Sequence, residues 1–459
     1  MSFGFKRVYF PKFTIQGCLA FVYKKKETMR ILKITFLLFS SLLFIQCKQS
    51  QKQLVAESYI DSLMTNYGTP KAITDNEKEI QFWQSRINGN AFDMVNKSRY
   101  AGNLVARFHL SGDINDVTKA DSLLLDIENK FENKQAGPFL ALSSNAILQH
   151  HFKNAENYLK QAKTIGIKNT ESYATTFDVD FELGNIEEAA ANLDKMKDPK
   201  DFGYQFRKSK MAHYLGELEE SISRMEKADS LVENNPILKS TALSNVGDLY
   251  THAGKLDKAL TCYQQSLKIN NSDLHSLMGI GWIALVHDGK DALATKIFEF
   301  VQTKTKSPDP LYKLILVAQY KKDAVAEAKY AKQFEAIVTD SIYGKMYNKY
   351  LIQLYTGILK NPVKAEALAK AELQNRATPQ TYSWYAFALL NNNKIDEANA
   401  IYKKHISGKP LEALELYYMG KLMEANKKGY NAKEFFKAAN ENFYDLSPSI
   451  GSDLESKLE

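Results

Sequence analysis

The stretch "LSNVGDLYTHAGKLDKALTCYQQSLKIN", Leu243 to Asn270, contains two segments of helical periodicity separated by a glycine. Leu243, Val246 and Tyr250 fall at positions i, i+3 and i+7, so they form one apolar stripe on a helix. Gly254 permits the turn between this helix and the next one. The stretch therefore predicts a helix–turn–helix unit.

Small residues in this stretch mark the points where two helices cross closely. Gly247 is such a residue on the first helix, and Ala259 is such a residue on the second. The position of Ala259 recurs over 277 residues in eight intervals, a mean step of about 34.6. A lattice this regular indicates an internal repeat of one supersecondary unit. Its members are Ala155, Ala189, Ser221, Ala259, Ala294, Ala328, Ala365, Ala398 and Ala432.

The spacing of large and small residues in Leu243–Asn270 resembles the tetratricopeptide repeat, a helix–turn–helix unit of about 34 residues. The resemblance extends from Tyr100 to Leu446. It implies an all-α fold, a right-handed superhelical solenoid of nine to ten such repeats. Each helix pair buries its apolar face only by stacking on its neighbours.

The resemblance also suggests how the chain is divided. We expect the solenoid to span residues 99–446. Residues 54–98 contain two further helical patterns and are expected to be N-terminal capping helices. Residues 447–459 are expected to form a C-terminal tail that starts near a proline.

The N-terminal region contains "MRILKITFLLFSSLLFIQC", Met29 to Cys47, with a short basic start and about a dozen mostly apolar residues. Such a run is shorter than the roughly 20 residues that span a bilayer. It resembles a bacterial lipoprotein signal, in which the cysteine becomes the first mature residue and carries the lipid. Gln46 stands where that family prefers a small residue. The resemblance implies a signal peptide over 29–46 and lipid attachment at Cys47, with a plain secretory signal or an uncleaved anchor as alternatives.

The residues around this signal complete the expected N-terminal organisation. Residues 1–28 are interpreted as upstream sequence translated ahead of the true start, or else as the leader of a longer signal. Residues 47–53 are expected to be a polar tether. Lys and Gln follow the cysteine instead of an acidic run, which favours the periplasmic face of the outer membrane over surface export. We therefore expect a lipid-anchored protein of the cell envelope.

The formal net charge of +7 does not indicate nucleic-acid binding. Residues 1–46 contain eight basic residues and one acidic residue, which leaves 52 of each sign in the rest of the chain. A neutral body exerts no global attraction on a phosphate backbone. Nucleic acid is therefore not an expected partner.

Catalytic and cofactor-binding motifs are absent from the sequence. It contains no phosphate-binding loop, dinucleotide fingerprint, His-Glu-x-x-His, Cys-x-x-Cys or Gly-x-Ser-x-Gly pattern. His150 and His151 are adjacent, so they point about 100° apart on a helix, and we expect a solvated turn there instead of a metal site. No enzymatic activity, no cofactor and no metal are expected.

The concave groove of a tetratricopeptide solenoid is lined by the first helix of each pair, and it usually binds peptides. The repeat register places ten candidate partner-binding residues there. They are Arg207, Lys210, His213, Asn245, Asp248, His252, Trp384, Tyr417, Lys421 and Glu424.

These residues do not complete the carboxylate clamp of chaperone-binding members. Lys210 and Asn245 match two of its positions, but Phe206, Ser276 and Ile280 occupy the flanking ones. We therefore expect an envelope-anchored, non-enzymatic scaffold that binds a peptide or helical segment of an envelope protein. The alternative is an outer-membrane lipoprotein that captures glycans or nutrients.

Overall fold

The computed structural model describes residues 52–87, 93–427 and 432–459. The predicted leader, signal peptide and Cys47, with most of the predicted tether, lie outside these residues. Gln53–Glu459 form one unit by their internal contacts. Among the described residues, no helix is long and apolar enough to cross a membrane.

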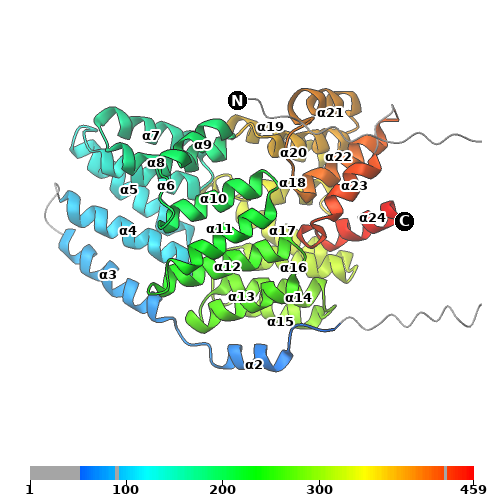
Figure 1. Ribbon diagram of the computed structural model, residues 1–459, viewed down its shortest axis with the longest axis horizontal. Helices are drawn as coiled ribbons and strands as arrows, with labels where there is room; N and C mark the ends of the chain where they lie inside the picture. The colour runs from blue at the N-terminus through cyan, green and yellow to red at the C-terminus, as the bar shows by residue number, and fades with distance from the viewer. Residues whose placement is uncertain (1–51, 88–92, 428–431) are drawn as a thin grey trace, which may run out of the picture. The chain divides into compact units, whose positions relative to one another are not determined.

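Ten consecutive helix pairs make up most of this unit (Figure 1). The pairs are α4 (Met94–Ser111) with α5 (Ile114–Lys130), α6 (Ala136–Leu148) with α7 (Phe152–Ile165), α8 (Asn169–Leu183) with α9 (Ile186–Lys195), α10 (Phe202–Tyr214) with α11 (Leu218–Ser230), α12 (Pro236–His252) with α13 (Leu256–Ile269), α14 (Leu274–Val286) with α15 (Asp291–Gln302), α16 (Asp309–Tyr320) with α17 (Ala324–Val338), α18 (Asn348–Thr356) with α19 (Pro362–Asn375), α20 (Pro379–Asn391) with α21 (Ile395–Ile401), and α22 (Ala413–Ala425) with α23 (Ala432–Asn440). The remaining elements are α2 (Glu57–Thr65), α3 (Lys71–Ile87), α24 (Pro448–Leu458), the 3₁₀ turns η1 (Ser341–Tyr343) and η3 (Phe443–Asp445), and the π-helical segment η2 (Tyr402–Ile406). The described ranges contain no strand, so the predicted all-α solenoid of nine to ten repeats is confirmed.

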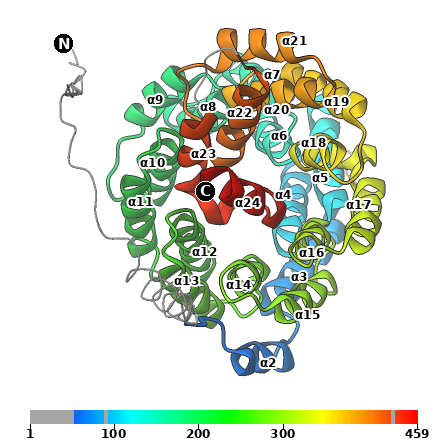
Figure 2. The same ribbon diagram turned by 90° about the vertical axis from the view of Figure 1, so that its right-hand side faces the viewer.

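The first helix of each pair lies on the inner side of the solenoid and the second on the outer side. Figure 2 shows this for α12 to α19. Local sequence fixes the ends of these helices: the Asn235 side chain accepts a hydrogen bond from Leu238 N at the start of α12, and Pro236 occupies its first turn. Gly254 has a φ of +68° in the turn to α13, a conformation that glycine adopts without strain.

Close contact between pairs depends on the predicted small residues. A Cβ atom added to Gly247 on α12 would lie 2.5 Å from Tyr263, and one added to Gly279 on α14 would also lie 2.5 Å from it. The Tyr263 ring on α13, itself 2% exposed, is therefore held between two glycine backbones of consecutive inner helices. This contact sets the distance between one repeat and the next.

The predicted lattice of small residues is buried at most of its positions. Seven of its nine members have no exposed surface: Ala155, Ala189, Ser221, Ala259, Ala294, Ala365 and Ala398. Ala328 was assigned to the lattice wrongly. It is half-buried, and the buried stripe of α17 runs instead through Ala331, Phe334 and Val338. Ala432, at the start of α23, is also only half-buried.

Consecutive turns of the superhelix contact each other at a nearly constant separation along the chain. Thr305 Oγ1 donates to the Ser111 carbonyl at 2.9 Å across 194 residues, and Arg376 lies 3.4 Å from Glu182 across 194 residues. With the mean step of about 34.6 residues, 194 residues correspond to about five and a half repeats per turn.

One buried side chain joins two turns through the backbone. Asn375 donates to the His150 carbonyl at 2.8 Å and accepts from the Phe152 N–H at 3.1 Å. The His150 ring stacks on Phe152, and burial lowers the pKa of His150 to about 4. His150 and His151 lie in the turn between α6 and α7, and both side chains are half-buried instead of fully solvated.

The two N-terminal helices occupy different places. α3 packs against α4, next to the first pair. α2 instead lies against α15. The Leu54 and Val55 amides donate to the Asp288 carboxylate, Lys290 donates to the Val55 carbonyl, and Lys296 pairs with Asp61.

Substitution of Gly247 tests the close contact between repeats. We expect Gly247→Ala to lower the free energy of unfolding by about 1–3 kcal/mol, because its Cβ overlaps Tyr263. Gly102→Ala on α4 is the matched control, since its Cβ meets nothing within 4 Å. Alanine there should stabilise the helix by about 0.5–1 kcal/mol. Urea unfolding followed by circular dichroism compares the two, and a Gly247→Ala midpoint at or above the control would refute the contact.

Candidate functional site

A cavity of about 510 Å³ lies on the inner face of the solenoid. The first helices of four consecutive pairs, α12, α14, α16 and α18, form most of its wall. The rest is formed by Tyr263, Glu412, Ala413, Leu414, Tyr444, Asp445 and Ser447. We call the concave face made by the first helices the inner groove.

The cavity wall repeats with the period of the fold. Asp248, Trp282, Leu316 and Tyr350 all line it, and each follows the previous one by 34 residues. One position of the repeat therefore faces the cavity in four successive pairs. A ligand lying along the inner groove would meet an acid, an indole, an aliphatic chain and a phenol in turn.

Two of the predicted groove residues on α12, Asp248 and His252, line the cavity. Asn245, one turn earlier on the same helix, is half-buried, and its amide donates to the Thr241 carbonyl at 2.8 Å. Asn245 is thus bonded to its own helix.

The predicted residues on α10 are bonded to the inner helix before them. Arg207 donates to both carboxylate oxygens of Asp178 on α8, at 3.0 and 2.6 Å. Lys210 donates to Glu182 on α8 at 2.7 Å. The His213 ring lies 5.0 Å from that of His252, which joins this part of the groove to the cavity wall.

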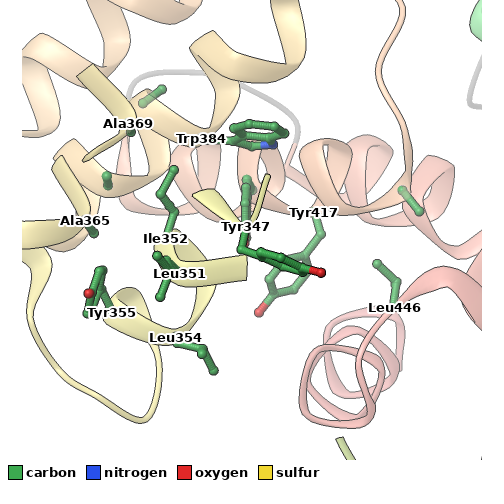
Figure 3. Packing of buried hydrophobic residues seen from close by; sticks show 14 of the residues in the cluster. Tyr347, Leu351, Ile352, Leu354, Tyr355, Ala365, Ala369, Trp384, Tyr417 and Leu446 are labelled. Atoms are coloured by element: carbon green, nitrogen blue, oxygen red, sulfur yellow. The ribbon is translucent and has the colours of Figure 1, made fainter. Parts of the chain in front are cut away.

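Trp384 is not available as a surface for a ligand. It follows Tyr350 by 34 residues, but it is 3% exposed and lies in the hydrophobic core (Figure 3). Its indole N–H donates to Glu415 Oε1 at 2.7 Å. The prediction that Trp384 contacts a partner is wrong, because α22 covers this step of the repeat.

The three predicted residues on α22 contact the chain's own C-terminal helix. Tyr417 donates to Asp453 on α24 at 2.7 Å, and Lys421 donates to the same carboxylate at 3.2 Å. Glu424 pairs with Lys457 at 2.7 Å. This end of the inner groove is therefore occupied.

Comparison with known families identifies the repeat. Residues 240–273 match the tetratricopeptide repeat family model, and these residues form α12 and α13 with the turn that follows. The chain therefore contains a tetratricopeptide repeat at these residues. No curated protein sequence matches the chain.

Solved structures resemble the chain only weakly. The Pseudomonas aeruginosa pilF structure is 16% identical, covers 48% of this chain and 99% of its own, and has a TM-score of 0.34. A tetratricopeptide repeat protein from Parabacteroides merdae is 15% identical, with 63% and 98% covered and a TM-score of 0.32. The Cut9-Hcn1 hetero-tetramer is 12% identical, with 88% and 69% covered and a TM-score of 0.46. TM-scores this low carry no conclusion about function.

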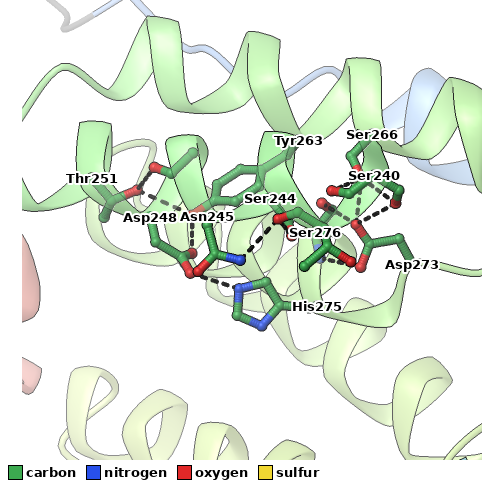
Figure 4. Close-up of polar contacts among 12 residues, drawn as sticks. Ser240, Ser244, Asn245, Asp248, Thr251, Tyr263, Ser266, Asp273, His275 and Ser276 are labelled. Atoms are coloured by element: carbon green, nitrogen blue, oxygen red, sulfur yellow. Dashed lines mark hydrogen bonds and ion pairs between the residues drawn. The ribbon is translucent and has the colours of Figure 1, made fainter. Parts of the chain in front are cut away.

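An ionic network that the sequence analysis missed surrounds Asp248 in the inner groove (Figure 4). Tyr263 donates to Asp248 at 2.7 Å, and His275 lies 2.7 Å from its other oxygen. The Asp248 charge raises the pKa of His275 to about 9, so the pair is ionic at neutral pH. Burial opposes the charge on Asp248, yet His275 and Tyr263 lower its pKa overall.

Two lysines in the cavity wall also escaped the sequence analysis. Lys313 lies 4.4 Å from the centre of the Trp282 ring, and burial lowers its pKa. Lys349 lies 3.7 Å from Glu415 and 3.8 Å from Glu412, whose charges raise its pKa. The step of 34 residues could have identified Lys313 from the sequence, because Lys313 follows the predicted groove residue Asn245 by two such steps.

The arrangement is one of paired charges and aromatic rings. In the part of the chain that the structure describes, no group of three or more His, Cys, Asp or Glu side chains could hold a metal ion. The groups in the cavity wall can form ion pairs, hydrogen bonds and ring contacts with a ligand.

The pair of Asp248 and His275 predicts a pH dependence of stability. The pKa of His275 rises from near 6.5 in the unfolded chain to about 9, so the stabilisation is complete below pH 6.5 and lost as the pH rises through 9. The His275 side chain is 55% exposed, so screening limits the effect to about 0.5–1 kcal/mol. The unfolding midpoint should therefore fall less between pH 6.5 and 9 in His275→Gln than in the unsubstituted chain. Identical pH profiles would rule out a stabilising pair.

Proposed function

We propose that this protein is an envelope-anchored, non-enzymatic scaffold that binds a peptide or helical segment of an envelope protein in its inner groove. The anchor is the lipid predicted at Cys47, and the groove faces the periplasm. No cofactor, metal or nucleic acid takes part.

The repeating cavity wall carries this proposal. Asp248, Trp282, Leu316 and Tyr350 present one side chain per repeat, so an extended or helical segment meets a new contact at each step. Aromatic anchors supply most of the binding energy in such contacts, whereas mixed charges favour one register and one partner.

Pairing within the groove supports a binding role over a catalytic one. Arg207, Lys210 and His275 each have a carboxylate partner on the preceding inner helix, within 3.0 Å. A partner segment that brings its own charges has to match this pre-formed pattern, which disfavours unrelated segments.

The cavity also supports a second candidate function, the capture of an oligosaccharide. Trp282, Tyr312 and Tyr350 line it together with the carboxylates of Asp309 and Glu412. Aromatic faces beside hydrogen-bonding acids suit sugar rings and their hydroxyl groups. Binding would stabilise the folded chain, so an increase in Tm with oligosaccharides tests this candidate.

Affinity capture tests the scaffold function. The tagged chain from Lys48 onward is crosslinked in solubilised envelope, and captured proteins are identified by mass spectrometry. We expect a small set of envelope proteins that is lost with Lys313→Glu, because the substitution reverses a charge in the cavity wall. A loss of at least tenfold is expected.

Lys332→Glu is the matched control. It makes the same charge change on an exposed residue of α17, the outer helix of the same pair. Circular dichroism checks that both variants fold. Capture that survives Lys313→Glu would exclude the groove as the binding site, and capture no better than a tag-only control would exclude the scaffold.

A further inference from the structure

We propose that the C-terminal segment, Asn442–Glu459, is a built-in occupant of the inner groove, which a partner displaces by presenting the same chemistry. The partner segment would carry two Asp-Leu pairs eight residues apart. This inference rests on the proposed function and specifies its partner.

The first half of the C-terminal segment binds the wall of the cavity. Asp445 lies 2.6 Å from His252 on α12, and Asn442 donates to the His252 carbonyl at 2.8 Å. The Trp282 indole on α14 donates to the Tyr444 carbonyl at 2.8 Å. Burial alone would lower the pKa of His252, but Asp445 raises it overall, which favours a charged contact.

The second half binds the neighbouring part of the inner groove. α24 packs against α16, and Figure 2 shows it inside the ring of helices. Asp453 accepts hydrogen bonds from Tyr417 and Lys421, and Lys457 pairs with Glu424. All three of the groove residues predicted on α22 are therefore engaged by the chain itself.

The two halves repeat one motif in the stretch "DLSPSIGSDL", residues 445–454. Asp445 and Asp453 each face a cationic groove residue, and each is followed by a buried leucine, Leu446 at 3% and Leu454 at 0% exposed. The inner groove thus accepts a carboxylate next to an aliphatic side chain at two places. A competing segment needs both pairs to replace all of these contacts.

The attachment of the C-terminal segment is suited to displacement. Its polar groove contacts are ion pairs and hydrogen bonds at partly exposed side chains, which individually contribute little. Leu446 and Leu454 add the buried apolar contacts of the segment. Because the C-terminal segment is tethered to the groove, its effective concentration there is about millimolar. Segments that bind the groove weakly cannot displace it, whereas segments that bind tightly can.

A labelled peptide of residues 442–459 tests the inference by fluorescence anisotropy. The otherwise unchanged chain with Asp445→Asn and Asp453→Asn should release its own segment and bind this peptide at least tenfold more tightly than the unsubstituted chain. Glu455→Gln with Glu459→Gln is the matched control, because it removes two charges at exposed positions of the same segment. That control should bind the peptide as weakly as the unsubstituted chain.

Hydrogen exchange supplies an independent measurement in the same chains. The amides of α24 should exchange at least tenfold faster in the Asp445→Asn, Asp453→Asn chain, while those of α12 and α13 stay protected. Equal peptide binding in all three chains, or unchanged exchange in α24, would overturn the inference.

The two proposals fail separately. If Lys313→Glu abolishes capture but none of the three chains binds the peptide, the scaffold function is supported and the proposal that the C-terminal segment occupies the groove is wrong. If the peptide binds the substituted chain as expected but no envelope protein is captured, the proposal for the C-terminal segment is supported and the scaffold function is wrong.

Discussion

The insertion of one aromatic ring between two glycine backbones sets the geometry on which the rest of the structure depends. Tyr263 fits between Gly247 and Gly279 only because neither carries a Cβ atom. Such contacts fix the step from one pair to the next, and in a solenoid a small change in each step accumulates along the array. The separation of about 194 residues between contacting turns is the sum of these steps.

Local patterns in the sequence predict the parts of the fold that each repeat determines by itself. The small-residue lattice identified the pairs because Ala155 and Ala259 must be small wherever a pair closes. It failed at Ala328, where the helix carries several alanines and the buried stripe starts at a different one. Contacts such as that of Asn375 with His150 depend on the pitch of the superhelix, which no single repeat encodes. The placement of α2 against α15 was missed for the same reason.

The candidate site was predicted in part because the register of the repeat gives the inward-facing positions but not their neighbours. Asp248 and His252 line the cavity as the register indicates. Trp384 occupies an equivalent position and is buried, since α22 covers it. The partners of Arg207 and Lys210 lie 29 and 28 residues earlier, on the preceding inner helix. Whether two such side chains form an ion pair depends on the angle between consecutive repeats. The residue types alone therefore could not predict these ion pairs.

Internal pairing and the C-terminal segment together determine what the groove can bind. Charges already matched within the wall, such as Asp248 with His275, contribute little new attraction to a ligand and penalise a segment with the wrong sign. The cations that face Asp445 and Asp453 are different, because their partners belong to a segment that can leave. Selectivity would therefore reside at these two places, and the aromatic cavity wall between them would contribute affinity. While the C-terminal segment occupies the inner groove, Trp282 and Leu454 stay buried. An exposed apolar surface would associate with unrelated proteins, so this burial limits non-specific association until a partner displaces the segment.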